Sequence, residues 1–369
     1  MGAHDAIKSL YLGVCQHVAN NRLHDYRWFV EQEIDTWKNW VDIPIGQRLQ
    51  LWRHGFTSPC AELYDLDERQ ANVYLSELQR YRLFKSANGA HRYLLDDKLS
   101  QHWMLSGQPE YRPTAYGLID RGHVHGVAST ALDRRPVPVS EWLPEALRTH
   151  SKLVLKHLRG LGGHQVIVCE YDDGFHLDGE RMSETALCES VSELSGYLVT
   201  AHVHQHSYAA ALYPEAANTI RALTIWDGER NELIVPIVIQ RIGTERSRPV
   251  DNFSQGGLTA EIDTRTGTIG RAAQKPFSGR VRWFSSHPDT GAAIEGETVP
   301  NWQNVLSTVR RLAKENTHTP VIGWDILLDE TGTPVVLEAN TGTDVSLFQI
   351  HRPLLTDQRV DEFVSRHLD

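Results

Sequence analysis

The sequence is poor in cysteine, with four residues spread over 369 positions and none in a C-x-x-C pair. Cys15, Cys60, Cys169 and Cys188 therefore predict neither a disulfide framework nor a zinc knuckle, and a reduced setting fits best. No apolar run approaches the roughly 18 residues of a membrane-spanning helix, and the polar start Met1–Asp5 is no signal peptide. We therefore expect a cytoplasmic protein with no membrane partner.

A basic surplus is also absent, because 47 acidic side chains outnumber 37 basic ones and the formal charge is −10. A surface that coats nucleic acid needs clustered lysine and arginine, so we expect no nucleic-acid partner. A local basic pocket remains compatible with this composition.

The signatures of covalent catalysis are missing as well. There is no G-x-S-x-G elbow, and no cysteine lies in a recognisable nucleophile context. His202, His204 and His206 alternate and would share one face of a strand, but no nearby cysteine or carboxylate completes a set of four zinc ligands. We expect neither a covalent enzyme nor a zinc enzyme.

What is present is an ordinary globular balance, with 40% apolar and 23% charged residues. Helical spacing, as in Tyr74, Leu75, Leu78 and Arg82, is typical of the first hundred residues, and strands separated by turns follow from about Tyr116. This pattern predicts an α+β fold, with a mostly helical region over residues 1–95 and a body over residues 96–369. The irregular stretch from residue 243 to 257 is a candidate mobile loop.

Two apolar runs near the end of the chain, Gly323–Leu328 and Val335–Asn340, are separated by a turn and predict a β-hairpin. They carry Asp325, Glu338 and Asn340, of which the last two share one strand face. Three oxygen ligands that leave room for water and phosphate suit Mg²⁺, which usually takes one or two protein carboxylates.

A glycine-rich turn follows a candidate strand lysine in the segment Lys156–His164. An ammonium group and several backbone N–H groups placed there could hold phosphates. The segment is not a Walker A loop, because no Gly-Lys-Ser/Thr follows, and a strand rather than a helix comes next. A plain hairpin with a surface lysine is the alternative interpretation.

The order of these features resembles the ATP-grasp superfamily, where a strand lysine and a flexible glycine loop precede the metal-binding hairpin. Asp96-Asp97-Lys98 with the later Pro113-Thr114 is similar to the D-K-x…P-T stretch that opens the nucleotide lobe, and Tyr197–Val203 looks like the strand that holds adenine. The glutamates usual near Thr200 and Ala201 are missing, so adenine recognition would rest on backbone groups. The resemblance implies a nucleotide site of Lys98, Lys156, Gly160, Gly162, Gly163, Val199, Thr200, Ala201 and Val203. It implies one or two Mg²⁺ ions, replaceable by Mn²⁺, on Asp325, Glu338 and Asn340.

Three further motifs indicate one particular family within this superfamily. N-T-x-R at Asn218–Arg221, R-x-G at Arg241–Gly243 and D-N-F-x-x-G-G at Asp251–Gly257 occur in the order seen in sugar-transfer associated ATP-grasp proteins. The likeness runs from about Asp96 to the C-terminus. The catalytic residues that it implies are Arg221, Arg241, Asn218, Asp251 and Asn252.

Two of these assignments have a physical basis and an alternative. Arg221 and Arg241 on adjacent strands could bind phosphate or carboxylate oxygens bidentately and stabilise a transferring phosphoryl group. Arginines in edge-strand salt bridges would look the same in sequence. For Asp251 and Asn252, which could orient an acceptor amine, the alternative is turn formation by their side chains.

The resemblance implies an ATP-grasp fold, with a first nucleotide lobe over residues 96–200 and a second lobe over residues 201–369. It implies a ligase that activates a small-molecule carboxylate (an amino acid, peptide or sugar acid) as an acyl phosphate and joins it to an amine, releasing ADP and phosphate. A phosphotransferase acting on a hydroxyl, or a nucleotide-binding protein without turnover, are the alternatives. The family name suggests polysaccharide or natural-product biosynthesis. The substrates stay open, and the helical first region could shape an acceptor pocket or a homodimer contact.

Overall fold

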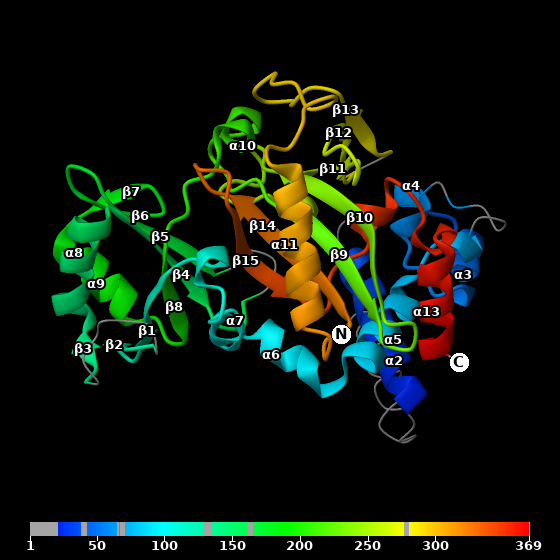
Figure 1. Cartoon of the computed structure of the whole chain (residues 1–369), viewed down its shortest axis with the longest axis horizontal. Helices are drawn as coiled ribbons and strands as arrows, with labels where there is room; N and C mark the ends of the chain where they lie inside the picture. Colours follow the sequence, from blue (N-terminus) through cyan, green and yellow to red (C-terminus); the bar gives the residue numbers. More distant parts are fainter. Residues whose placement is uncertain are drawn as a thin grey trace.

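Two antiparallel sheets with helices packed on them build the molecule, and helices from both ends of the chain gather beside the second sheet (Figure 1). The computed structural model describes residues 21–37, 43–64, 66, 71–127, 135–160, 165–276 and 280–368. The predicted α+β fold with a helical first region is confirmed. None of the helices in these ranges is long and apolar enough to span a membrane.

The first part of the chain is helical. Its helices are α2 (Asn21–Trp37), α3 (Ile45–Arg53), α4 (Cys60–Tyr64), α5 (Glu77–Asn88), α6 (Arg92–Asp96) and α7 (Lys98–Met104). The prediction that Tyr74 and Leu75 belong to the helix of Leu78 is wrong. Ser76 caps α5, because its hydroxyl accepts from the Gln79 N–H and its own N–H donates to the Gln79 side chain.

The first sheet forms one lobe, on the left of Figure 1, with the strand order β3-β2-β1-β8-β4-β5-β6-β7. Its strands are β1 (Ala115–Asp120), β2 (His123–His125), β3 (Val137–Pro138), β4 (Lys152–His157), β5 (Val166–Tyr171), β6 (Phe175–Leu177), β7 (Glu180–Met182) and β8 (Tyr197–Ala201). Helices α8 (Val139–His150) and α9 (Glu184–Ser192) belong to the same lobe, and Leu143 and Leu187 share a core with Leu155 and Val199. The predicted strand Tyr197–Val203 is too long, because β8 ends at Ala201.

The second sheet has the order β13-β12-β11-β10-β9-β14-β15. Its strands are β9 (Ile220–Asp227), β10 (Glu232–Ile242), β11 (Leu258–Ile262), β12 (Ile269–Gln274), β13 (Arg282–Phe284), β14 (Val321–Leu328) and β15 (Pro334–Asn340). The predicted hairpin is the β14–β15 pair, in which Asp325 lies opposite Glu338. Helices α10 (Ser207–Leu212), α11 (Trp302–Glu315), α12 (Ser346–Gln349) and α13 (Gln358–Leu368) complete this part.

Alternation along the strands gives the second sheet two buried faces. One face packs on α11, where Trp324 of β14 and Val309 of the helix share a core. The other face packs on helices from both ends of the chain, so that Phe84 of α5 and Phe363 of α13 lie in one cluster with Ile237 of β10. The helical first region is therefore part of the packing of the second sheet.

The stretch from residue 243 to 257 folds back on itself beside the end of β10. Asp251 and Phe253 within it are buried, and a Cβ atom at Gly257 would come within 2.6 Å of the Asp251 carbonyl oxygen. Glycine is needed there because the backbone passes so closely. Movement of this loop stays a prediction.

Candidate active site

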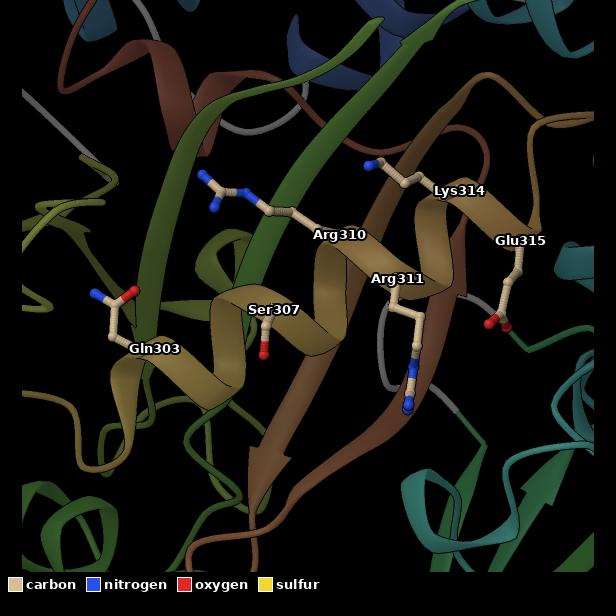
Figure 2. Close-up of a pocket in the computed structure, with 6 residues that line it drawn as sticks. All are labelled: Gln303, Ser307, Arg310, Arg311, Lys314 and Glu315. Atoms are coloured by element: carbon tan, nitrogen blue, oxygen red, sulfur yellow. The ribbon is translucent and has the colours of Figure 1, made fainter.

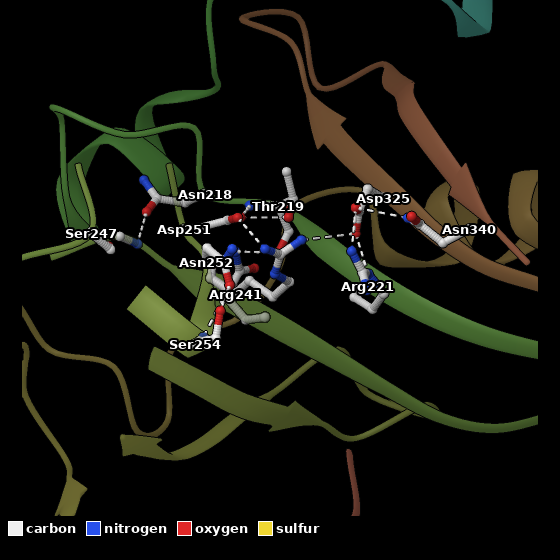
Figure 3. Close-up of polar contacts among 12 residues, drawn as sticks. Asn218, Thr219, Arg221, Arg241, Ser247, Asp251, Asn252, Ser254, Asp325 and Asn340 are labelled. Carbon is white, nitrogen blue, oxygen red and sulfur yellow. Dashed lines mark hydrogen bonds and ion pairs between the residues drawn. The ribbon is translucent and has the colours of Figure 1, made fainter. Parts of the chain in front are cut away.

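The centre of the candidate site is a buried cluster of arginines and carboxylates on one face of the second sheet (Figure 3). Arg221 of β9 lies directly opposite Asp325 of β14, and its Nε and Nη2 groups donate to the two carboxylate oxygens. Arg241 of β10 donates through Nη1 to Asp325 Oδ1 at 3.2 Å. The predicted arginines and the predicted aspartate therefore meet.

The charges in this cluster are strongly coupled. Burial alone would raise the pKa of Asp325, but Arg221 and Arg241 outweigh it and hold that pKa below its ordinary value. Burial likewise opposes the charge of Arg221, and the Asp325 carboxylate restores it and raises the arginine pKa. Asp325 and Arg221 therefore stabilise each other's charged forms.

Asp251 connects the loop of residues 243–257 to the cluster through side-chain contacts with Arg241 and Thr219. Its Oδ1 pairs with Arg241 Nη2 at 2.8 Å, and its Oδ2 accepts from the Thr219 N–H at 2.8 Å and from the Thr219 hydroxyl at 2.5 Å. Burial raises the pKa of Asp251, partly offset by Arg241. The Nε–H of Arg241 is buried and has no hydrogen-bond partner among the described residues. An oxygen atom of a bound anion could accept a hydrogen bond from this N–H group.

The two predicted asparagines hold backbone rather than an open site. Asn218 is buried, its Oδ1 accepts from the Gly243 N–H at 2.8 Å, and its amide donates to backbone carbonyls that include Tyr213 at 2.6 Å. Asn252 accepts from the Ser254 N–H at 3.0 Å and caps a short turn. These contacts support a positioning role for both side chains.

Two lysines, Lys98 and Lys156, lie near the β14–β15 hairpin. Lys98, at the start of α7, donates to the Gly160 carbonyl at 2.8 Å and pairs with Glu338 Oε1 at 3.1 Å. Lys156 of β4 has its pKa lowered from 10.5 to about 8, first by burial and then by Lys98, against the opposing effect of Glu338. Gly160 is described, whereas the predicted loop residues Gly162 and Gly163 lie outside the described residues.

The predicted adenine strand divides into two parts. Val199 is fully buried in the core of the first lobe, and β8 lies between β1 and β4, so the backbone groups of Val199 and Thr200 belong to the sheet ladders. Beyond Ala201 the strand ends, and among the described residues the N–H of Val203 has no hydrogen-bond partner. The free backbone groups thus lie where the chain leaves the first lobe.

The donor set of Asp325, Glu338 and Asn340 fits Mg²⁺ by its chemistry, with two carboxylates and one amide oxygen on paired strands. Glu338 is more open than Asp325, with a quarter of its side chain exposed against 6% for the aspartate. Asp325 is closed by the two arginines and by the Asn340 amide at 3.3 Å. Within the described ranges, no group of three His, Cys, Asp or Glu residues is placed to hold a metal ion.

Sequence reasoning missed the residues that hold these groups in place. Thr343 accepts from Arg221 Nη1 at 3.0 Å and packs on Gly323, where a Cβ atom would come within 2.6 Å of its hydroxyl oxygen. Thr219 holds Asp251. Thr219 could have been found, because it lies inside the N-T-x-R motif, whereas no pattern singles out Thr343.

A surface pocket elsewhere does not share these residues. It is lined by the outer face of α11 (Gln303, Ser307, Arg310, Arg311, Lys314 and Glu315), whose side chains extend from the helix in Figure 2. A polar outer face is expected for a helix that packs its apolar face on a sheet.

The fold and the site define an ATP-grasp protein. A family model described as sugar-transfer associated ATP-grasp matches residues 79–361, which is more than half of the chain. The chain belongs to this family. A search of curated proteins finds no match.

Solved structures with a remote likeness include a synthetase and two ligases, one of them described as an ATP-grasp ligase. An ADP complex of PurK, the N5-carboxyaminoimidazole ribonucleotide synthetase, is 12% identical with a TM-score of 0.39 over 71% of this chain and 52% of that chain. D-Alanine–D-alanine ligase from Bacillus anthracis is 16% identical with a TM-score of 0.37 over 74% and 68%. The ligase PsnB with its minimal precursor is 14% identical with a TM-score of 0.39 over 76% and 64%. This chain thus spans about half the length of the PurK chain.

Proposed function

We propose that this protein is an ATP-dependent ligase that joins a carboxylate to an amine. The observation that carries the proposal is the ion pair of Lys98 with Glu338 at 3.1 Å, in a place where the charge of Glu338 also acts on Lys156 of the first sheet. The lysine side chains could bind the phosphates of a nucleotide directly. The neighbouring Glu338 carboxylate could bind a Mg²⁺ ion that the same phosphates also coordinate. Family membership supports ATP as the nucleotide.

In the proposed reaction a substrate carboxylate oxygen attacks the γ-phosphorus of ATP, and the bond to the β-phosphate oxygen breaks to release ADP. Lys98 and Lys156 hold the phosphates, and Arg241 offers its free Nε–H to the transferring oxygens. Mg²⁺ held by Glu338, Asn340 and Asp325 would neutralise phosphate charge and orient the oxygens.

The amine then attacks the acyl carbon of the acyl phosphate, the carbon–oxygen bond to phosphate breaks, and the amine loses a proton to solvent. The charged cluster of Arg221, Arg241 and Asp325 is fixed by strands on either side, so it can bind an anionic group with little rearrangement. Cytoplasmic location, an amino acid, peptide or sugar acid as substrate, and a role in polysaccharide or natural-product biosynthesis belong to the same proposal.

The experiment is to measure ADP and phosphate release with Mg-ATP and a panel of carboxylates in the presence of hydroxylamine. Hydroxylamine traps an acyl phosphate without the true amine. Hydroxamate with one class of carboxylate is the expected result. ADP without hydroxamate or phosphate, in the presence of a hydroxylated compound, would instead indicate a phosphotransferase. ATP binding with no ADP from any compound would indicate a protein without turnover.

A further inference from the structure

A surface cavity lies between the C-terminal half of α11 and the β9–β10 hairpin. Its lining includes Trp226 and Leu233 of the hairpin and Arg310 and Lys314 of the helix. The cavity volume is about 570 Å³, within the range of roughly 300–1,000 Å³ that is usual for small-molecule sites. The cavity is therefore large enough for a small ligand.

The hairpin gives this cavity an apolar surface. Trp226 of β9 and Leu233 of β10 are cross-strand partners, so their side chains share one face of the second sheet. Both are half-buried, and Leu233 packs against the core that α11 covers. The indole and the leucine side chain thus offer apolar contact area to a ring beside the helix.

The helix adds two cations to the same cavity. Arg310 and Lys314 are one helical turn apart, and Figure 2 shows both extending from one side of α11, whereas Arg311 extends from the other. Within the part of the chain that the structure describes, neither Arg310 nor Lys314 has an ion pair or a side-chain hydrogen bond. Glu232, a carboxylate in the lining, pairs with Arg359 at 3.2 Å instead.

The lack of a counter-charge for these two cations points to an anion. The chain has a formal charge of −10, so carboxylates are plentiful, yet among the described residues none pairs with Arg310 or Lys314. Like charges one turn apart on a helix repel each other and weaken the helix slightly. A bound anion would offset this repulsion, and a guanidinium group can bind phosphate oxygens bidentately. Two cations also match the charge of a phosphate monoester, which lies between about −1.5 and −2 at pH 7.

We propose that this cavity binds an aromatic phosphate monoester, with Arg310 and Lys314 on the phosphate and Trp226 against the ring. The site goes beyond the proposed ligase function, because it is separate from the candidate active site. Arg221 and Trp226 are five residues apart on β9 and therefore point to opposite faces of the second sheet. Helix α11 packs on the face that carries Trp226.

The test is calorimetric binding of phenyl phosphate to the full chain and to charge variants. The unmodified protein should bind phenyl phosphate about tenfold more tightly than inorganic phosphate, because only phenyl phosphate has a ring that can contact the indole. The double variant Arg310→Gln/Lys314→Gln should weaken phenyl phosphate by at least about tenfold, since it loses charge-assisted hydrogen bonds. Arg311→Gln removes one charge from the other side of the same helix, so it is the matched control and should keep the affinity.

A second measurement locates the ring. Phenyl phosphate should shift one indole N–H signal in ¹H–¹⁵N spectra of the unmodified protein, and Trp226→Phe should lack that signal. If Trp226→Phe does not fold, the indole signal that moves in the unmodified protein and in Arg311→Gln should stay in place in the double variant.

Phenyl phosphate binding that survives in the double variant would belong to another site and would overturn the inference, as would no binding by the unmodified protein. Equal affinity for phenyl phosphate and inorganic phosphate would refute the contact between the ring and Trp226. A shift of the Trp226 signal by an acidic peptide and not by phenyl phosphate would refute the small-molecule assignment. All of these results leave the ligase proposal intact, because none of the substituted residues belongs to the candidate active site.

Discussion

The buried charges of the candidate site are balanced at the level of single side chains. Asp325 forms ion pairs with both Arg221 and Arg241. Arg241 also pairs with Asp251 through its Nη2 group. Each of these buried charges therefore has a partner of opposite sign. Unpaired charges in such a place would be costly. Glu338 is different, because a quarter of its side chain is exposed while it pairs with Lys98.

Replacing Glu338 with Gln should therefore abolish turnover without unfolding the protein. The variant removes a proposed metal ligand and the counter-charge of Lys98 and Lys156, and loss of one electrostatic group of this kind typically costs about 10²–10³ in rate. ADP formation is the measurement, with the far-ultraviolet dichroism spectrum as a check of folding. Glu330→Gln on the exposed turn of the same hairpin is the control. Near-normal ADP formation by the Glu338 variant would disprove the metal assignment.

If Lys156 binds the phosphates as proposed, nucleotide binding should depend on pH. Its pKa of about 8 in the free protein means that at pH 9 the amine is mostly neutral. Phosphates would restore the charge, so binding of Mg-ADP should take up a proton and weaken as pH rises above 8. Calorimetry at pH 9 in buffers of different ionisation enthalpy measures this uptake. Lys156→Met should lose it, and an uptake that survives in Lys156→Met would contradict the prediction.

The same pKa sets the direction of a stability effect. The unfolded chain holds the Lys156 proton up to about pH 10.5 and the folded protein only up to about pH 8. Between these values the unfolded state binds more protons, so the contribution of this residue to stability rises with pH. This contribution of Lys156 to the free energy of unfolding is fully present above about pH 10.5 and is lost as the pH falls through about 8.

Among the helices and strands, α5 both packs on the second sheet and forms hydrogen bonds with the segment that follows β15. Buried Asn88 at its end donates to the carbonyls of Val321 at 2.8 Å and Thr341 at 3.1 Å, and accepts from the Val321 N–H at 2.9 Å. Arg80 of the same helix donates to the carbonyls of Gly342 and Thr343. The helix thus fixes the segment that follows Asn340.

Replacing Asn88 with Ala should destabilise the protein by about 2 kcal/mol, because three buried backbone groups lose their partner. Denaturant unfolding monitored by fluorescence measures this free energy. Ser86→Ala, at an exposed position of α5, is the matched control and should change stability little. An Asn88 variant as stable as the control would show that the segment is held by other contacts.

Much of the secondary structure and the main charged residues could be predicted because their signals are local. The turn Asp329–Gly332, the cap Gly89 and the apolar runs of β14 and β15 are all local signals in the sequence. The partners of Arg221, by contrast, come from strands about a hundred residues later, and only the register of β9 on β14 brings Asp325 opposite. The structure also shows that Asn218 is used for backbone support, which no local pattern reveals.

At the scale of the whole molecule, the two sheets have separate cores with α7 between them: Leu99 packs with Leu198 of the first sheet, and Met104 and Leu105 pack in the core of the second. The core of Ile119, Leu155 and Val199 lies entirely within the first lobe. Across the boundary, Lys98 contacts Glu338 and Gln101 accepts from the Ala339 N–H at 3.1 Å. Multidomain proteins with such boundaries often do not unfold in one step.

We therefore expect two transitions in calorimetric unfolding without nucleotide, and a rise of both when Mg-ADP is added. The nucleotide would contact Lys156 in one lobe and Glu338 in the other, and at a hundred times its dissociation constant a ligand stabilises the state that binds it by about 2.7 kcal/mol. Two core variants assign the transitions. Leu155→Ala, fully buried in the first lobe, should lower one transition, and Val309→Ala, fully buried under the second sheet, should lower the other.

The result that would contradict this picture is one transition that both variants lower equally. In that case the contacts of Lys98 and Gln101 would couple the lobes even without nucleotide. The lysines and Glu338 would then be held in a preassembled arrangement, so nucleotide binding would not need to close the lobes. Two transitions of which Mg-ADP raises only one would instead place the nucleotide on a single lobe, and the proposed bridging by Lys156 and Glu338 would be wrong.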